Sequence, residues 1–205
     1  MWLFLIIVVV VLAVLVGLSL LRSIRGDSAA KIDPFGVSEP WRHFVLGAQR
    51  AGTKLHTTVD TADEGPLRNR MLAIVERSDT GLEETWRIAK RGDQIDETVR
   101  RLDPTALRLK HASLTTRRNA TPTPDLVAAV TSVEKQLASA DRLTAQSART
   151  ADTLRLAQTR LDEIVSRAAE VSIGAGDTDR YEHDVDDLVI ELEALRQAVE
   201  ETNRA

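Results

Sequence analysis

The side chains best suited to chemistry lie together between Glu182 and Asp187. This stretch reads E-H-D-V-D-D, and carboxylate oxygens and imidazole nitrogens are common ligands of metal ions. A metal-dependent enzyme is therefore one function to consider. The stretch also lies near the start of an expected helix, where the positive end of the helix dipole stabilises acidic side chains. We favour this structural explanation and predict no metal site.

The other candidate residues do not form a recognisable site. No two histidines have the i, i+4 spacing of a zinc-binding helix; they are His43, His56, His111 and His183. Asp177-Thr178-Asp179 begins like a calcium loop, but Tyr181 stands where an oxygen ligand is needed. No glycine-rich phosphate loop or serine elbow occurs. We therefore predict that the protein is not an enzyme, with no catalytic residue, no cofactor and no small-molecule substrate.

Charge and cysteine content exclude further kinds of site and partner. The chain has no cysteine, which excludes disulfides, thiolate metal sites and a cysteine nucleophile. Its formal net charge is −4, with acidic and basic residues interspersed, whereas a nucleic-acid-binding protein needs a basic face. We expect no nucleic-acid partner. The basic pairs Lys90-Arg91 and Arg117-Arg118 could bind phosphate or lipid headgroups, but we favour the simpler interpretation that they are solvated.

The N-terminal segment predicts a membrane anchor. Residues Met1 to Leu21 contain no charged side chain, and a helix of that length, at about 1.5 Å per residue, spans a hydrocarbon core of roughly 30 Å. A signal peptide cleaved near Ser28-Ala29-Ala30 is the alternative. However, no basic residue precedes the apolar run, and the run is longer than the roughly 7–15 residues usual in signal peptides. We predict an uncleaved anchor over residues 1–24, which contacts the lipid bilayer through residues 1–22.

The flanks of this span predict its direction. Trp2 and Phe4 suit one membrane interface, and Arg22 and Arg25 suit the other. Because the basic flank follows the span, the positive-inside rule places the rest of the chain in the cytoplasm. We therefore expect a single-pass protein of the cell membrane with a cytoplasmic body.

The rest of the chain predicts helices. Aromatic residues make up only 3% of the sequence, and no run of alternating β-branched residues is long enough for a strand. After a linker over 25–38, we expect a helical region over 39–118 and a second linker over 119–124. The expected helices in this region cover 39–61, then 66–102 with a break or kink near 78–81 and another break at 92–93, then 104–117.

The first of these helices has two features that bear on the fold. Ser38 is its expected N-cap, because a serine hydroxyl can accept from the free N–H groups of a first turn. Trp41 and Phe44 are expected in the core, although a position on lipid headgroups is an alternative.

The clearest pattern is a 4-3 spacing of mostly apolar residues over 125–203, typical of a coiled coil. It predicts a helix over 125–172, a turn at Gly174-Ala175-Gly176 and a returning helix over 178–202. The seam of the first helix comprises Leu126, Val130, Val133, Leu137, Ala140, Thr144, Ser147, Ala151, Leu154, Gln158, Leu161, Val165 and Ala168. The returning helix is too short to cover the first half of this seam. That half must pack on residues 39–117 or on another copy of the chain.

Several short motifs carry a resemblance to a known family. They are Asp33-Pro34-Phe35-Gly36, Glu39-Pro40-Trp41-Arg42, Trp86-Arg87-Ile88-Ala89-Lys90-Arg91-Gly92-Asp93 and Asp184-Val185-Asp186-Asp187-Leu188. In these motifs the chain resembles an uncharacterised family of actinobacterial single-pass membrane coiled-coil proteins, over nearly its whole length. The resemblance implies a membrane location and a helical architecture, and it carries no activity and no catalytic residues.

The sequence therefore predicts an all-α protein with an N-terminal transmembrane helix, a helical bundle and an antiparallel coiled-coil hairpin. The expected function is that of a membrane-anchored scaffold or tether, which binds a protein partner or itself through the heptad faces. A non-catalytic subunit of a membrane signalling or envelope assembly is one alternative, and a metal-dependent enzyme is another.

Overall fold

The computed structural model describes residues 32–62, 64–174 and 176–201. The chain divides into two units, Met1–Asp33 and Pro34–Ala205, and the second is described here. The predicted anchor over residues 1–24 lies outside the described residues. Among the residues that are described, no helix combines the length and the apolar character needed to cross a membrane.

The described part of the chain is helical throughout and contains no strand, which confirms the all-α prediction. Its elements, in chain order, are η1 (Pro34–Gly36), α2 (Trp41–Asp60), α3 (Pro66–Leu102), α4 (Pro104–Ala120), α5 (Pro124–Ser172) and α6 (Thr178–Glu201). Pro66, Pro104 and Pro124 each open a helix at the first position, where a missing N–H costs nothing.

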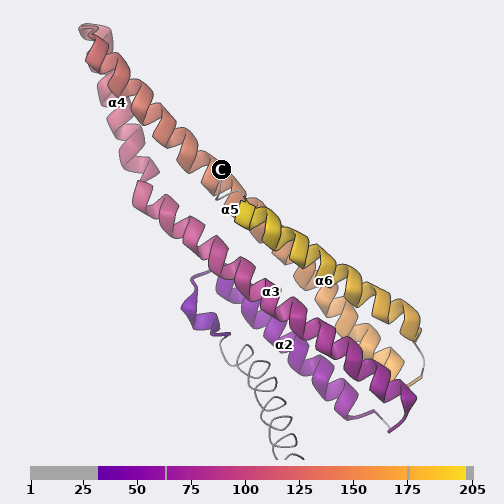
Figure 1. Cartoon of the computed structure of the whole chain (residues 1–205). Helices are drawn as coiled ribbons and strands as arrows, with labels where there is room; N and C mark the ends of the chain where they lie inside the picture. Colours follow the sequence, from indigo (N-terminus) through magenta and orange to yellow (C-terminus); the bar gives the residue numbers. More distant parts are fainter. Residues whose placement is uncertain (1–31, 63, 175, 202–205) are drawn as a thin grey trace, which may run out of the picture. The chain divides into compact units, whose positions relative to one another are not determined.

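Four of these helices form a bundle (Figure 1). Helix α2 packs on α3 and α5, and α6 packs on α3 and on the C-terminal part of α5. Ion pairs fix the directions: Arg160 with Glu191 and Arg167 with Asp184 show that α6 runs back antiparallel to α5. The largest fully buried side chains of the core are Trp41, Tyr181, Leu55, Met71, Ile74, Ile88, Leu154, Val45, Val59, Val75, Val130 and Val171.

Beyond the bundle, α4 and the first part of α5 form a two-helix projection (Figure 1). We call α4 together with residues 124–146 the distal arm. Asp103, at φ +46°, separates α3 from α4 and caps α4 by accepting from Ala106 N at 3.0 Å. The N-terminal half of α5 therefore packs on the chain's own α4 and α3, which is one of the two outcomes that the length of α6 allows.

The predicted breaks in α3 are wrong, because this helix is continuous from Pro66 to Leu102. Its glycines provide room for neighbouring helices and do not end the helix. A Cβ at Gly81 would meet Leu192 at 3.5 Å, and a Cβ at Gly92 would lie 2.5 Å from Cζ3 of Trp41. A glycine looks the same in sequence whether it ends a helix or leaves room for a neighbouring helix.

The predicted capping role of Ser38 is also wrong. Helix α2 begins at Trp41 after Pro40, without a side-chain cap. The hydroxyl and the backbone N–H of Ser38 both donate to Oδ1 of Asp93, and the backbone bond measures 3.1 Å. Trp41 and Phe44 are buried, which confirms their core position and excludes the position on lipid headgroups.

The apolar stripe of α5 changes width along the helix. In the distal arm it is a narrow seam with Val130, Val133 and Ala140 buried. In the bundle a second row is also buried, which comprises Thr150, Ala157, Ile164 and Val171. The second row is needed because the C-terminal part of α5 contacts α2, α3 and α6, whereas the arm has one pair of helices.

Candidate functional site

The acidic stretch from Glu182 to Asp187 forms ion pairs between helices. Arg70 donates to Glu182 at 2.9 Å, Arg77 pairs with Asp186 at 2.7 Å, and Arg167 pairs with Asp184. The hydrogen bond from Arg70 lowers the pKa of Glu182 and keeps this carboxylate ionised. Within the described ranges, no group of three histidine or carboxylate side chains could hold a metal ion. The stretch ties α6 to α3 and α5.

The four histidines are not brought together. His56 lies 3.2 Å from Asp79, His111 lies 3.2 Å from Glu134, and His183 lies 3.5 Å from a carboxylate oxygen one turn along α6. The ring of His43 packs edge-on against Phe44, with 6.1 Å between the ring centroids. Each contact lies on a different part of the bundle or arm, so the histidines do not form a joint site.

A polar junction fixes the beginning of α2 to the middle of the bundle. Nε1 of Trp41 donates to Oδ2 of Asp96 at 2.7 Å, and the hydroxyl of Ser147 donates to the other oxygen of Asp96. One carboxylate therefore connects α2, α3 and α5. Ser147 stood out in the sequence as a polar residue in the heptad seam, whereas no sequence signal marked Asp96.

The junction also explains two of the sequence motifs. Residues 39–42 and 86–93, far apart along the chain, meet where Trp41 covers Gly92, and the neighbouring Ser38 binds Asp93. The guanidinium of Arg42 lies 5.5 Å above the exposed ring of Phe35 and donates to the carbonyl of Val37 at 3.1 Å. These contacts stabilise the place where the chain enters the bundle, and they contain no pair of groups arranged for acid–base or nucleophilic chemistry.

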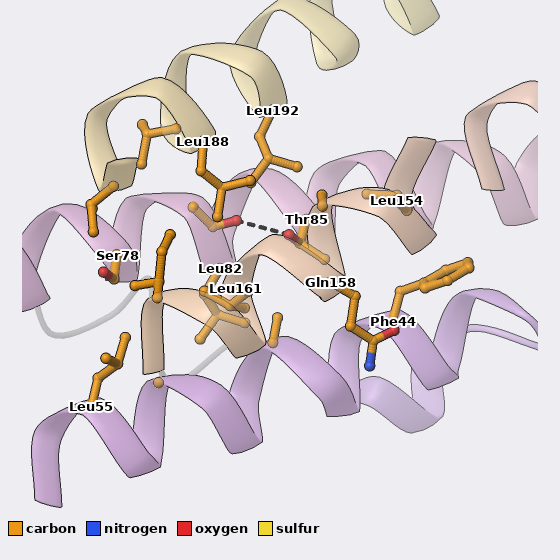
Figure 2. A pocket seen from close by; sticks show the side chains of 17 residues that line it. Phe44, Leu55, Ser78, Leu82, Thr85, Leu154, Gln158, Leu161, Leu188 and Leu192 are labelled. Atoms are coloured by element: carbon orange, nitrogen blue, oxygen red, sulfur yellow. Dashed lines mark hydrogen bonds between the residues drawn. The ribbon is translucent and has the colours of Figure 1, made fainter. Parts of the chain in front are cut away.

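The interior of the bundle contains one small apolar space (Figure 2). Side chains from all four helices line it, among them Phe44, Leu82, Leu154 and Leu188. The cavity volume is about 30 Å³, which is room for one or two water molecules and far too little for a substrate. The hydroxyl of Thr85 points back to its own helix and donates to the carbonyl of Gly81 at 2.9 Å.

Few residues of the distal arm are buried. Leu107 is the only buried residue of α4, and the side chain of Leu109 on the same helix is 71% exposed. Two contacts link the paired helices by charge, Arg108 with Asp141 at 3.5 Å and His111 with Glu134 at 3.2 Å. A thin pair of helices with few buried residues is suited to contact another molecule along its sides.

The charged residues of α4 are all basic. It contains Arg108, Lys110, Arg117 and Arg118 and no Asp or Glu. Lys110, Arg117 and Arg118 form no ion pair with any residue that the structure describes. Arg117 and Arg118 are in the last turn, where they also complement the helix dipole. The arm thus presents an unpaired basic surface to solvent.

Comparisons with protein-family models, with curated proteins and with solved structures give no match.

Proposed function

We propose that the protein is a membrane-anchored scaffold or tether without catalytic activity. Residues 1–21 would hold it in the cell membrane, and the basic flank that follows would place the helical body on the cytoplasmic side. The distal arm would be the part offered to a protein partner.

The distal arm is the observation that carries the proposal. Helix α6 returns only along the C-terminal part of α5, and α2 packs on the same part of the bundle. The heptad seam thus continues past the four-helix bundle into the distal arm, which has only two helices. A projecting helical pair is a common means of placing a binding surface away from a domain, because each helix keeps its outer face free.

The surface of the arm indicates the chemistry of the partner. Its unpaired cations at Lys110, Arg117 and Arg118 favour an acidic protein surface, and the exposed Leu109 supplies an apolar contact next to Lys110. A partner with these properties would be steered by charge and retained by apolar burial. Self-association through the arm would require an acidic surface on the second copy.

A non-catalytic subunit of a membrane signalling or envelope assembly is the second candidate. The junction of Trp41 with Gly92 and Asp96 favours it, since this junction holds the beginning of α2 against α3 and α5. A metal-dependent enzyme has less support, because the carboxylates that would bind the metal are engaged by Arg70, Arg77 and Arg167.

The test uses a photo-cross-linking amino acid in the full chain, expressed in its native membrane. One variant carries it at Leu109 in the arm, and the matched control carries it at Ile190 on α6, a position with 63% exposure against 71% at Leu109. We expect a discrete cross-linked protein from position 109 and none from position 190. Equal cross-linking from both positions, or none from position 109, would contradict the assignment of the arm as the binding element.

A further inference from the structure

A second surface feature lies between α3 and the C-terminal end of α6, away from the arm. It is a groove of about 300 Å³ lined by Arg87, Ile88, Lys90, Arg91, Gln94, Arg196, Val199 and Glu200. Half of these side chains carry a positive charge, and one carries a negative charge. Ile88 and Val199 are buried and provide apolar walls.

Two of the cations are neutralised by the protein itself. Arg87 lies 2.5 Å from Glu84, whose side chain is 4% exposed, and Nε of Arg196 lies 2.6 Å from the other oxygen of the same carboxylate. Arg196 also pairs with Glu200 at 2.9 Å. These pairs connect α3 to α6 and hold the two arginines in fixed positions on one side of the groove.

The other two cations have no carboxylate partner among the described residues. The ammonium of Lys90 lies 5.6 Å from the centre of the Trp86 ring, and Nη1 of Arg91 donates to the neutral amide oxygen of Gln94 at 2.8 Å. Arg87 also pairs with Glu83 at 3.4 Å, so three carboxylates, Glu83, Glu84 and Glu200, face Arg87 and Arg196. The two charges of Lys90 and Arg91 exceed the one negative charge that these ion pairs leave over. The groove therefore has a net positive charge.

Arg91 also has a hydrogen-bond donor without an acceptor. Its Nε atom is buried and has no hydrogen-bond partner within the described structure. Because this atom is shielded from solvent, a ligand in the groove would contact the guanidinium through its terminal Nη groups. A guanidinium presents its N–H groups in a planar fork that matches the oxygens of a phosphate or carboxylate.

We propose that this groove binds a phosphate group, with Arg91 and Lys90 as the binding residues. A phosphate supplies several acceptor oxygens, which suits two cations that have only neutral partners. The volume is at the lower limit of about 300–1,000 Å³ for ligand pockets, which favours a small phosphorylated compound or a lipid headgroup over a large cofactor. This site is separate from the distal arm and does not depend on the proposed partner of the arm.

The test titrates inorganic phosphate by calorimetry into the full chain held in nanodiscs of neutral phosphatidylcholine. The variant Lys90→Gln/Arg91→Gln removes the two cations, and the control Arg50→Gln/Lys54→Gln removes two exposed cations of α2 that also form no ion pair within the described structure. We expect saturable binding, weakened at least about tenfold in the first variant and unchanged in the control. No saturable binding, or equal weakening by both variants, would overturn the proposal. Circular dichroism verifies that each variant is folded.

A second arm of the experiment identifies the source of the phosphate. The nanodiscs are doped either with phosphatidic acid, a phosphomonoester lipid, or with phosphatidylglycerol, a phosphodiester lipid, at matched surface charge. If the ligand is a headgroup, phosphatidic acid weakens the titration by inorganic phosphate at least about tenfold and phosphatidylglycerol does not. If the source is a soluble compound, both lipids leave the titration unchanged. Equal weakening by both lipids would indicate surface charge alone and would count against a specific phosphate site.

Discussion

The indole of Trp41 lies against Gly92 so closely that a Cβ at position 92 would be 2.5 Å from Cζ3 of the ring. Trp41 is completely buried, and its Nε1 is held by Asp96 one turn further along α3. The ring therefore cannot move away easily. Since real Cβ atoms do not approach other carbons at this distance, the contact between α2 and α3 requires glycine at position 92.

Substitution Gly92→Ala should destabilise the bundle. The added methyl group displaces a buried aromatic ring, and overpacking of this kind costs about 1–3 kcal/mol, so we expect the free energy of unfolding to fall by about 2 kcal/mol. The measurement is urea denaturation followed by circular dichroism. The control is Gly52→Ala on α2, where a Cβ would meet no atom within 4 Å. It should raise the stability by about 0.5–1 kcal/mol through helix propensity. A neutral Gly92→Ala variant would contradict the close packing of α2 on α3.

The buried carboxylate of Glu84 should make Arg196 sensitive to substitution. Removing one partner of a buried ion pair leaves an uncompensated charge. Arg196→Met should lower the free energy of unfolding by about 2 kcal/mol, less than the 3–5 kcal/mol of a fully buried pair because Arg87 still faces Glu84. In the double variant Glu84→Met/Arg196→Met, apolar side chains replace both charges, and most of the stability should return. Chemical denaturation of both variants tests this prediction. A double variant with a lower free energy of unfolding than the single variant would refute it.

Tyr181 should make the stability of the fold fall at high pH. Its ring is fully buried, its hydroxyl has no hydrogen-bond partner in the described structure, and burial raises its pKa to about 12. The unfolded chain loses this proton near the ordinary value of 10 given for tyrosine. The native state is thus stabilised relative to the unfolded state below that pH, and the contribution is lost as the pH rises towards 12.

The variant Tyr181→Phe isolates this effect. It removes only a buried hydroxyl without a partner, so near neutral pH it should be as stable as the original protein or slightly more stable. Between about pH 10 and pH 12, its melting temperature should fall less steeply than that of the original protein. Thermal melts of the two proteins over this range provide the measurement. Parallel curves would show that the hydroxyl ionises as easily in the folded protein as in the unfolded chain.

Much of the helical architecture could be predicted because it depends on local patterns. The 4-3 spacing after residue 125, the prolines at 104 and 124, and the glycines near 175 all act over one or two turns of helix. They gave helix positions close to those observed, with α5 at Pro124–Ser172 and α6 at Thr178–Glu201. The length difference between these two helices indicated that the first half of α5 packs on residues 39–117 or on another copy of the chain, and the structure shows it packed on α3 and α4.

The contacts between distant segments could not be predicted from local patterns. Gly92 appeared to be a helix breaker because its function as a space for Trp41 depends on α2, which lies far away in the sequence. Ser38 appeared to be a cap because it precedes a helix in the sequence. Its actual partner, Asp93, belongs to another helix and could not be recognised from local sequence. The sequence indicated the groove between α3 and α6 only through the basic pair Lys90-Arg91, since the opposite wall of the groove comes from α6.

Alkaline carbonate extraction tests whether residues 1–21 anchor the helical tether in the membrane. Membranes from cells that express the full chain, or a chain beginning at residue 25, are washed at high pH and then floated on a density gradient. We expect the full chain to stay with the floating membranes and the shortened chain to be released into the supernatant. Release of the full chain together with the shortened one would contradict the membrane anchor and the tether built on it.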